Sequence, residues 1–95
     1  MNIPSQFDLM GRTFKVNASP KLGIDYHGLC SPDTNEIHIS KDIPYTKMES
    51  VFFHELVHAI LSLMGECELY GNEKFVETFG GLLHQAMSTS KGVIK

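Results

Sequence analysis

The chain has 95 residues, of which 42% are apolar and 20% are charged, and its formal net charge is -3. This is the composition of a globular protein, so it excludes a disordered or fibrous chain and predicts a single domain. Within that domain we expect residues 1–44 to form a sheet region, residues 45–89 to form the helices of the functional site and residues 90–95 to form a tail.

The charge pattern and the apolar runs limit the partners. The chain has 8 basic and 11 acidic residues and no basic stripe for phosphates, so we expect no nucleic-acid ligand. No apolar run is longer than the one at Val51–Phe53, and the first residues lack the pattern of a secretory signal. We therefore expect a cytoplasmic protein with no membrane partner, in which Cys30 and Cys67 are reduced thiols.

Three segments of the first half are predicted to be strands. Apolar and polar residues alternate in residues 13–18 and again in residues 36–40, as in strands with one buried face. Residues 24–30 are a weaker candidate, and the turn-forming residues 31–35 would connect them to the next strand as a hairpin. The expected fold is α+β: a small antiparallel sheet of about three strands followed by an antiparallel two-helix hairpin that carries the metal site, a minimal zincin core.

Two helices are predicted in the second half. Thr46 and Glu49 have the spacing of a capping box, so the first helix should begin at about Thr46, and Gly65 can end it. Asn72 is a suitable N-cap for a second helix, which we expect to fray after Ser88. Apolar residues recur at helical spacing within the second helix: Phe75, Val76, Phe79, Leu82, Leu83, Ala86 and Met87.

The predicted first helix contains the HExxH pattern, formed by His54, Glu55 and His58. Residues four apart lie on one face of a helix, so both imidazoles can reach a single metal ion. Glu55 is rotated by about 100° from His54, which puts its carboxylate beside the ion, where it can act as a general base toward water. The pattern has a probability of only about 2% of arising by chance in a chain of this composition, so we expect one bound Zn²⁺ ion.

Glu73 and Glu77 on the predicted second helix are candidates for a third protein ligand, which catalytic zinc sites usually have. They are four residues apart and share one helix face. In an antiparallel hairpin the earlier glutamate would face His58 and the later one would face His54. This suggests Glu73 as the third ligand and Glu77 as the acceptor of the free His54 N–H, although the two roles could be exchanged. Gly80 and Gly81 fall inside this helix, with Gly80 on the same face, and both would permit close approach of the helices at the metal.

The segment of residues 71–80, which follows the HELVH motif, resembles the NExxxD segment of the thermolysin-like gluzincins. In that family the glutamate of the NE pair, here Glu73, is the third zinc ligand. The short chain and residues 73–83 are also similar to the ImmA/IrrE group of small bacterial and phage metallopeptidases, which act on regulatory proteins. The chain departs from the gluzincin pattern in two ways: Glu77 stands where Asp or Asn is usual, and only fourteen residues separate His58 from Glu73. Glu77 therefore remains an alternative ligand.

Thermolysin-like enzymes also use His or Tyr donors, downstream of the third ligand, that stabilise a tetrahedral oxyanion. The local candidates for this role are Tyr70, between the two predicted helices, and Tyr45, just before the first one. His84 shares the helix face of Glu73 but lies eleven residues further along, about 16 Å away, which is too far to complete the same metal site.

Together these residues predict zinc-dependent hydrolysis of a peptide bond in a protein or peptide substrate, with Glu55 as the general base. The strand that carries Ile37 and Ile39 is a candidate edge against which an extended substrate could pair. The alternative is a non-catalytic regulatory or binding module that keeps the metal for stability, or a latent enzyme whose own C-terminal residues cover the cleft. Glu55 favours the enzyme, since a purely structural site has no use for a general base.

Overall fold

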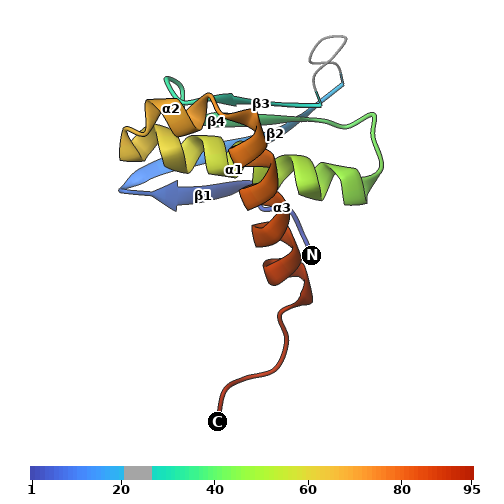
Figure 1. Cartoon of the computed structure of the whole chain (residues 1–95). Helices are drawn as coiled ribbons and strands as arrows, with labels where there is room; N and C mark the ends of the chain where they lie inside the picture. Colours follow the sequence, from blue (N-terminus) through green and yellow to red (C-terminus); the bar gives the residue numbers. More distant parts are fainter. Residues whose placement is uncertain (21–26) are drawn as a thin grey trace.

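The computed structural model describes residues 1–20 and 27–95. In chain order its elements are β1 (Gln6–Leu9), β2 (Arg12–Ser19), β3 (Gly28–Ser31), β4 (Glu36–Ser40), α1 (Tyr45–Met64), α2 (Cys67–Tyr70) and α3 (Glu73–Thr89). The strands form one layer, and α1 lies along one face of it (Figure 1). Helix α3 crosses α1, and its second half projects away from the body of the molecule (Figure 1).

The sheet has four strands in the order β1-β2-β4-β3. β1 and β2 are antiparallel, β3 and β4 are antiparallel, and β2 and β4 are parallel. The small α+β fold is as predicted, but the expectation of about three antiparallel strands was wrong. β4 inserts between β2 and its own hairpin partner β3, and this placement makes one pair parallel. No local sequence pattern encodes that choice of neighbour.

Two of the predicted strands have a different extent or position from the expected one. The weaker candidate, residues 24–30, lies partly outside the described residues, and β3 begins only at Gly28. β4 is an interior strand, so the prediction that the strand of Ile37 and Ile39 is an edge was wrong. The edge beside α1 is formed by β3. The turn between β3 and β4 is confirmed, because the Thr34 N–H donates to the Ser31 carbonyl at 3.2 Å.

The strand β1 was not predicted from the sequence. It is four residues long, and its inward side chains are Phe7 and Leu9. A tight turn with positive φ at Met10 (50°) and Gly11 (78°) leads into β2. The ring of Phe7 then stacks on that of Phe14 with centroids 5.4 Å apart. Two inward residues are too few for a periodicity signal, so the strand depends on its pairing with β2.

Helix α1 begins one residue earlier than expected and without the predicted capping box. Its N-cap is Pro44, and no side chain there bonds the free backbone N–H groups. Glu49 is instead buried, with Oε1 3.1 Å from His84 Nε2. The packing of α3 on α1 therefore overrides the local capping signal. The end of the helix is confirmed, because Gly65 adopts the left-handed conformation with a φ of 74°.

Helix α3 begins as predicted, and the Asn72 side chain accepts a hydrogen bond of 3.0 Å from the Phe75 N–H. The expected two-helix hairpin is corrected by the short helix α2, which lies between α1 and α3. The hydrophobic core lies between the sheet and α1 and includes Phe14, Ile37, Ile39, Phe52 and Phe53. No helix within the described residues has the length and hydropathy that crossing a membrane requires.

Candidate metal centre

Helix α1 presents His54, Glu55 and His58 at the place where β3 and α3 meet it. Glu55 is 8% exposed and His58 is 7% exposed, so two of the three polar side chains lie inside the protein. Burying such groups costs free energy unless a partner satisfies them. The partners come from α3, whose first turns pass over this part of α1 (Figure 1).

The carboxylate of Glu73 lies between the two imidazoles. Its Oε2 is 3.1 Å from His54 Nε2, and its Oε1 is 3.3 Å from His58 Nε2. One ligand atom from each of the three residues lies within 4.8 Å of the others, so the group could hold a metal ion. Ligand atoms around a tetrahedral zinc ion are about 3.3 Å apart when each bond is near 2.0 to 2.1 Å. The three side chains therefore fit that ion.

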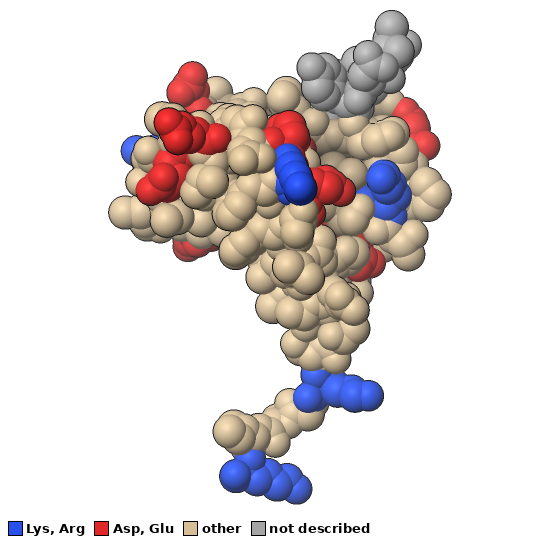
Figure 2. Space-filling model, in the orientation of Figure 1, with Lys and Arg blue, Asp and Glu red and all other residues tan. Residues whose placement is uncertain are grey.

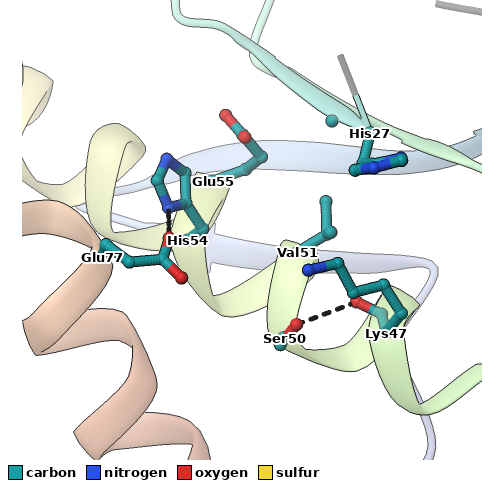
Figure 3. A pocket seen from close by; sticks show the side chains of 8 residues that line it. His27, Lys47, Ser50, Val51, His54, Glu55 and Glu77 are labelled. Carbon is teal, nitrogen blue, oxygen red and sulfur yellow. Dashed lines mark hydrogen bonds and ion pairs between the residues drawn. The ribbon is translucent and has the colours of Figure 1, made fainter. Parts of the chain in front are cut away.

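A second glutamate of α3 orients His54. The Oε2 of Glu77 is 2.7 Å from His54 Nδ1, which donates the hydrogen bond (Figure 3). In a neutral imidazole this leaves the lone pair on Nε2, the atom that faces Glu73. A lone pair and a carboxylate that face each other across 3.1 Å repel unless a proton or a cation lies between them. This donor arrangement agrees with a cation site. Glu73 spans both histidines, whereas the sequence analysis paired it with His58 alone.

The imidazole of His58 has fewer polar partners than the imidazole of His54. Its Nδ1 is buried and has no hydrogen-bond partner of normal geometry among the described residues. The Tyr70 ring packs against the imidazole with centroids 4.6 Å apart. Burial lowers the pKa of His58, and His54 lowers it further, while Glu73 and the Tyr70 backbone oppose this effect. The ring is thus held in the neutral form, which is the form that binds metal.

Glu55 lies against the backbone of β3 at Gly28. A Cβ atom added at Gly28 would lie 2.4 Å from Val51 Cγ1 and 3.1 Å from Glu55 Oε2, so only glycine allows this approach. Burial raises the pKa of Glu55 to about 7, an effect that Glu73 reinforces and His54 opposes. A carboxyl with that pKa can both accept and release a proton near neutral pH. Gly28 was not singled out in the sequence, because its neighbour on α1 is distant along the chain.

Two cavities open on either side of Glu55 and share the wall formed by Gly28. The first has a volume of about 240 Å³, and Lys47, Ser50 and His54 are among the residues that line it (Figure 3). The second has a volume of about 280 Å³ and is lined by Gly28, Leu29, Cys30, His54, Glu55, His58, Tyr70 and Glu73. Both cavities are lined by Gly28, His54 and Glu55, so they adjoin each other where β3 meets α1. Lys47 was not recognised as a lining residue from sequence.

The structure separates the two tyrosines proposed as oxyanion donors. Tyr70 lines the second cavity beside His58, and burial raises the pKa of its hydroxyl, with the nearby Cys30, Glu55, Glu73 and Asp33 raising it further. Tyr45 lies elsewhere: its hydroxyl accepts a hydrogen bond of 2.8 Å from the Ile3 N–H, and it lines a different cavity beside β2 and β4. Only Tyr70 is brought to the histidines.

The crossing of α1 and α3 has its closest point at Gly80. A Cβ atom there would lie 3.3 Å from both the His54 Cα and the Phe53 carbonyl oxygen. The neighbouring Gly81 has no such contact within 4 Å, so the expected role in close approach was wrong for that glycine, which faces away from α1. Close approach at Gly80 allows α3 to hold its glutamates over α1, in line with the position expected for this glycine. Further along α3, His84 pairs with Glu49 and stacks on Phe53, away from the metal ligands.

Both thiols are free in the described structure, with Cys30 buried and Cys67 exposed. Burial, together with the smaller effect of the Glu55 carboxylate, raises the pKa of Cys30 to about 12, so this thiol stays neutral. No protein-family model, no curated protein and no solved structure matches this chain.

Proposed function

We propose that this chain is a zinc-dependent peptidase in which His54, His58 and Glu73 hold the ion and Glu55 is the general base. The observation that carries the proposal is the convergence of two Nε2 atoms and one carboxylate at distances of 3.1 and 3.3 Å. A zinc ion bound there supplies Lewis-acid chemistry, which acidifies water and polarises a carbonyl group.

Glu55 is suited to move a proton in this site. Its carboxylate lies in the shared wall of the two cavities, and its pKa of about 7 matches the requirement for a group that accepts a proton and later returns it. We infer that Glu55 takes the proton of the attacking water and passes it to the leaving amine. The Tyr70 hydroxyl, on the far side of His58, is the candidate donor to the developing oxyanion.

The substrate class follows from the edge strand. β3 pairs with β4 on one side only among the described residues, and its residues Gly28–Cys30 line the second cavity beside the histidines. An extended polypeptide can add to such an edge through backbone hydrogen bonds. We therefore propose that the substrate is a protein or peptide segment, which agrees with the resemblance to small metallopeptidases that act on regulatory proteins.

The test compares zinc content and cleavage of a denatured-protein substrate in four proteins. The wild type should bind about one zinc and cleave the substrate. Glu55→Gln should keep the zinc and lose about 10²-fold or more of the activity, because it removes only the proton acceptor. His58→Ala should lose both. His38→Ala is the matched control, since His38 lies on β4 beside Glu36, and it should change neither property.

Two outcomes would contradict the proposal. If the wild type binds no zinc, the metal centre itself is refuted. If it binds zinc but shows no cleavage that depends on Glu55, the second candidate is favoured, which is a regulatory or binding module that holds a metal for stability. The latent form of the enzyme, with the C-terminal residues over the cleft, finds no support in the fold, because every residue from Gln85 to Lys95 is exposed.

A further inference from the structure

The outer face of α3 carries an apolar stripe, and beyond its first residue, which packs against Val57, Leu61 and Val76, it is exposed in the described structure. Its residues follow one another at intervals of four, three and four: Phe75, Phe79, Leu82 and Ala86. The Phe79 side chain is 48% exposed and Leu82 is 63% exposed. Alternation of four and three is the spacing of the seam along which two helices pack as a coiled coil. Large exposed apolar patches of this kind mark interaction surfaces.

A different stripe of α3 makes its contacts with α1. Val76 and Gly80 are buried and Leu83 is partly buried against the core, and these residues lie roughly 100° around the helix from the outer stripe. His84 is the last residue of α3 that is not exposed, although the helix continues to Thr89 (Figure 1). A helix end without tertiary contacts is marginal in water. Both the stripe and the projecting end therefore lack a partner.

The stripe is continuous with an apolar groove between α1 and α3. The groove has a volume of about 220 Å³, and Phe75 and Phe79 form one of its walls. The other wall comes from α1 and α2 and consists of Val57, Ile60, Leu61, Met64 and Leu69. Met64 is 63% exposed at the rim. The apolar surface thus extends from the body of the molecule along α3.

The charges are segregated along the same direction. Acidic side chains gather on the body, around α2 and the start of α3, while the projecting tip is basic and the helix between them is uncharged (Figure 2). The sequence accounts for this pattern: residues 66–77 contain four glutamates and one lysine, residues 78–90 contain no Asp, Glu, Lys or Arg, and Lys91 and Lys95 follow. Two of these glutamates, Glu73 and Glu77, face the histidines. The exposed Glu66 and Glu68 on the body therefore make one end of the molecule negative, and the lysines make the other end positive.

We propose that the outer stripe of α3 is the interface of a homodimer, in which two α3 helices pack antiparallel across a two-fold axis near Leu82. A second copy of the chain matches this surface in its apolar spacing and in its charge (Figure 2). Antiparallel packing places the basic tip of each copy over the acidic body of the other, whereas parallel packing would bring like charges together. A two-fold interface also uses the same stripe on both copies, which an uncharged seam permits.

The assembly is tested by sedimentation equilibrium of the zinc-loaded chain from low to high micromolar concentration. The wild type should approach twice the chain mass of 10.6 kDa as the concentration rises. Leu82→Glu should remain at the monomer mass, because it places two carboxylates together at the axis. Gln85→Glu adds the same charge on the neighbouring polar face of α3 and is the matched control, which should still dimerise. Leu82→Ala should weaken association without adding charge. This variant tests the interface if Leu82→Glu does not fold.

The orientation is tested separately by reversing the charge of the tip. The double variant Lys91→Glu with Lys95→Glu should dissociate about tenfold more readily than the wild type at low salt, and the difference should shrink in high salt. Unchanged association of this variant would overturn the antiparallel orientation. A wild type that stays monomeric at the highest concentration, or a Leu82→Glu variant that dimerises like the wild type, would overturn the interface itself. None of these outcomes depends on peptidase activity.

Discussion

The two helices that build the candidate centre are held in the molecule very differently. α1 packs against the sheet, and nine of its twenty residues are buried. α3 has only two buried residues in seventeen, Val76 and Gly80. The histidines therefore stand on a rigid element, whereas Glu73 and Glu77 stand on one that is weakly anchored. A metal ion that bridges α1 and α3 would supply part of the anchorage that packing does not.

Removal of the proposed zinc ion should have the largest effect on the difference between the two helices, because the ion would supply part of the anchorage of α3. Without zinc, the amide protection of α3 should fall sharply, while that of α1 around Phe52 and Phe53 should change little, because core packing does not depend on the ion. Hydrogen exchange with mass spectrometry, with and without a chelator, measures both helices in one sample. An equal loss in α1 and α3 would show that the two helices form one cooperative unit. Unchanged protection in α3 would show that packing alone anchors it.

The glycine pair of α3 tests how closely the helices must approach. Gly80→Ala should destabilise the protein by about 1 to 3 kcal/mol and weaken zinc binding, because its Cβ would press on the His54 backbone. Gly81→Ala meets nothing within 4 Å and should stabilise the protein by up to about 1 kcal/mol through helix propensity. Urea unfolding of both variants gives the comparison. The same sign for both variants would contradict the close-approach argument.

The most local effect that we expect is that of Glu55 titration on the stability of the metal-free protein. Its pKa is raised from 4.5 to about 7, so the folded state binds more protons than the unfolded state between these values. The contribution of this group to stability is therefore complete below pH 4.5 and is lost as the pH rises through 7. Glu55→Gln removes the titration. The wild type should lose about 2 to 3 kcal/mol relative to this variant between pH 4.5 and 8.

The free energy of unfolding of both proteins, measured in chelator across this pH range, checks the prediction. The lowered pKa of His58 acts in the opposite direction, since its contribution is lost as the pH falls below 6.5. His58 is common to the wild type and the variant, so its effect cancels in their difference. A difference that does not change with pH would show that the Glu55 carboxyl is better solvated than its burial suggests.

The parts of the fold that could be predicted are those that depend on residues close together in the chain. The helix around HELVH, the left-handed end at Gly65 and the N-cap at Asn72 each follow from a pattern a few residues long. The same holds for the turn from Ser31 to Asn35, where short polar side chains favour a reversal of the chain. These features succeed because 3.6-residue periodicity and capping chemistry are local.

The sequence by itself thus determined a helix with two histidines on one face and a glutamate beside them, and a second helix with two glutamates on one face. The tertiary structure decided the rest: the parallel pairing of β2 with β4, the burial of Glu49 against His84, the approach of Glu55 to Gly28 and the crossing at Gly80. Each of these joins residues that are far apart in the chain. Their partners are selected by the packing of whole elements, and the energy of that packing is not written in any short stretch of sequence.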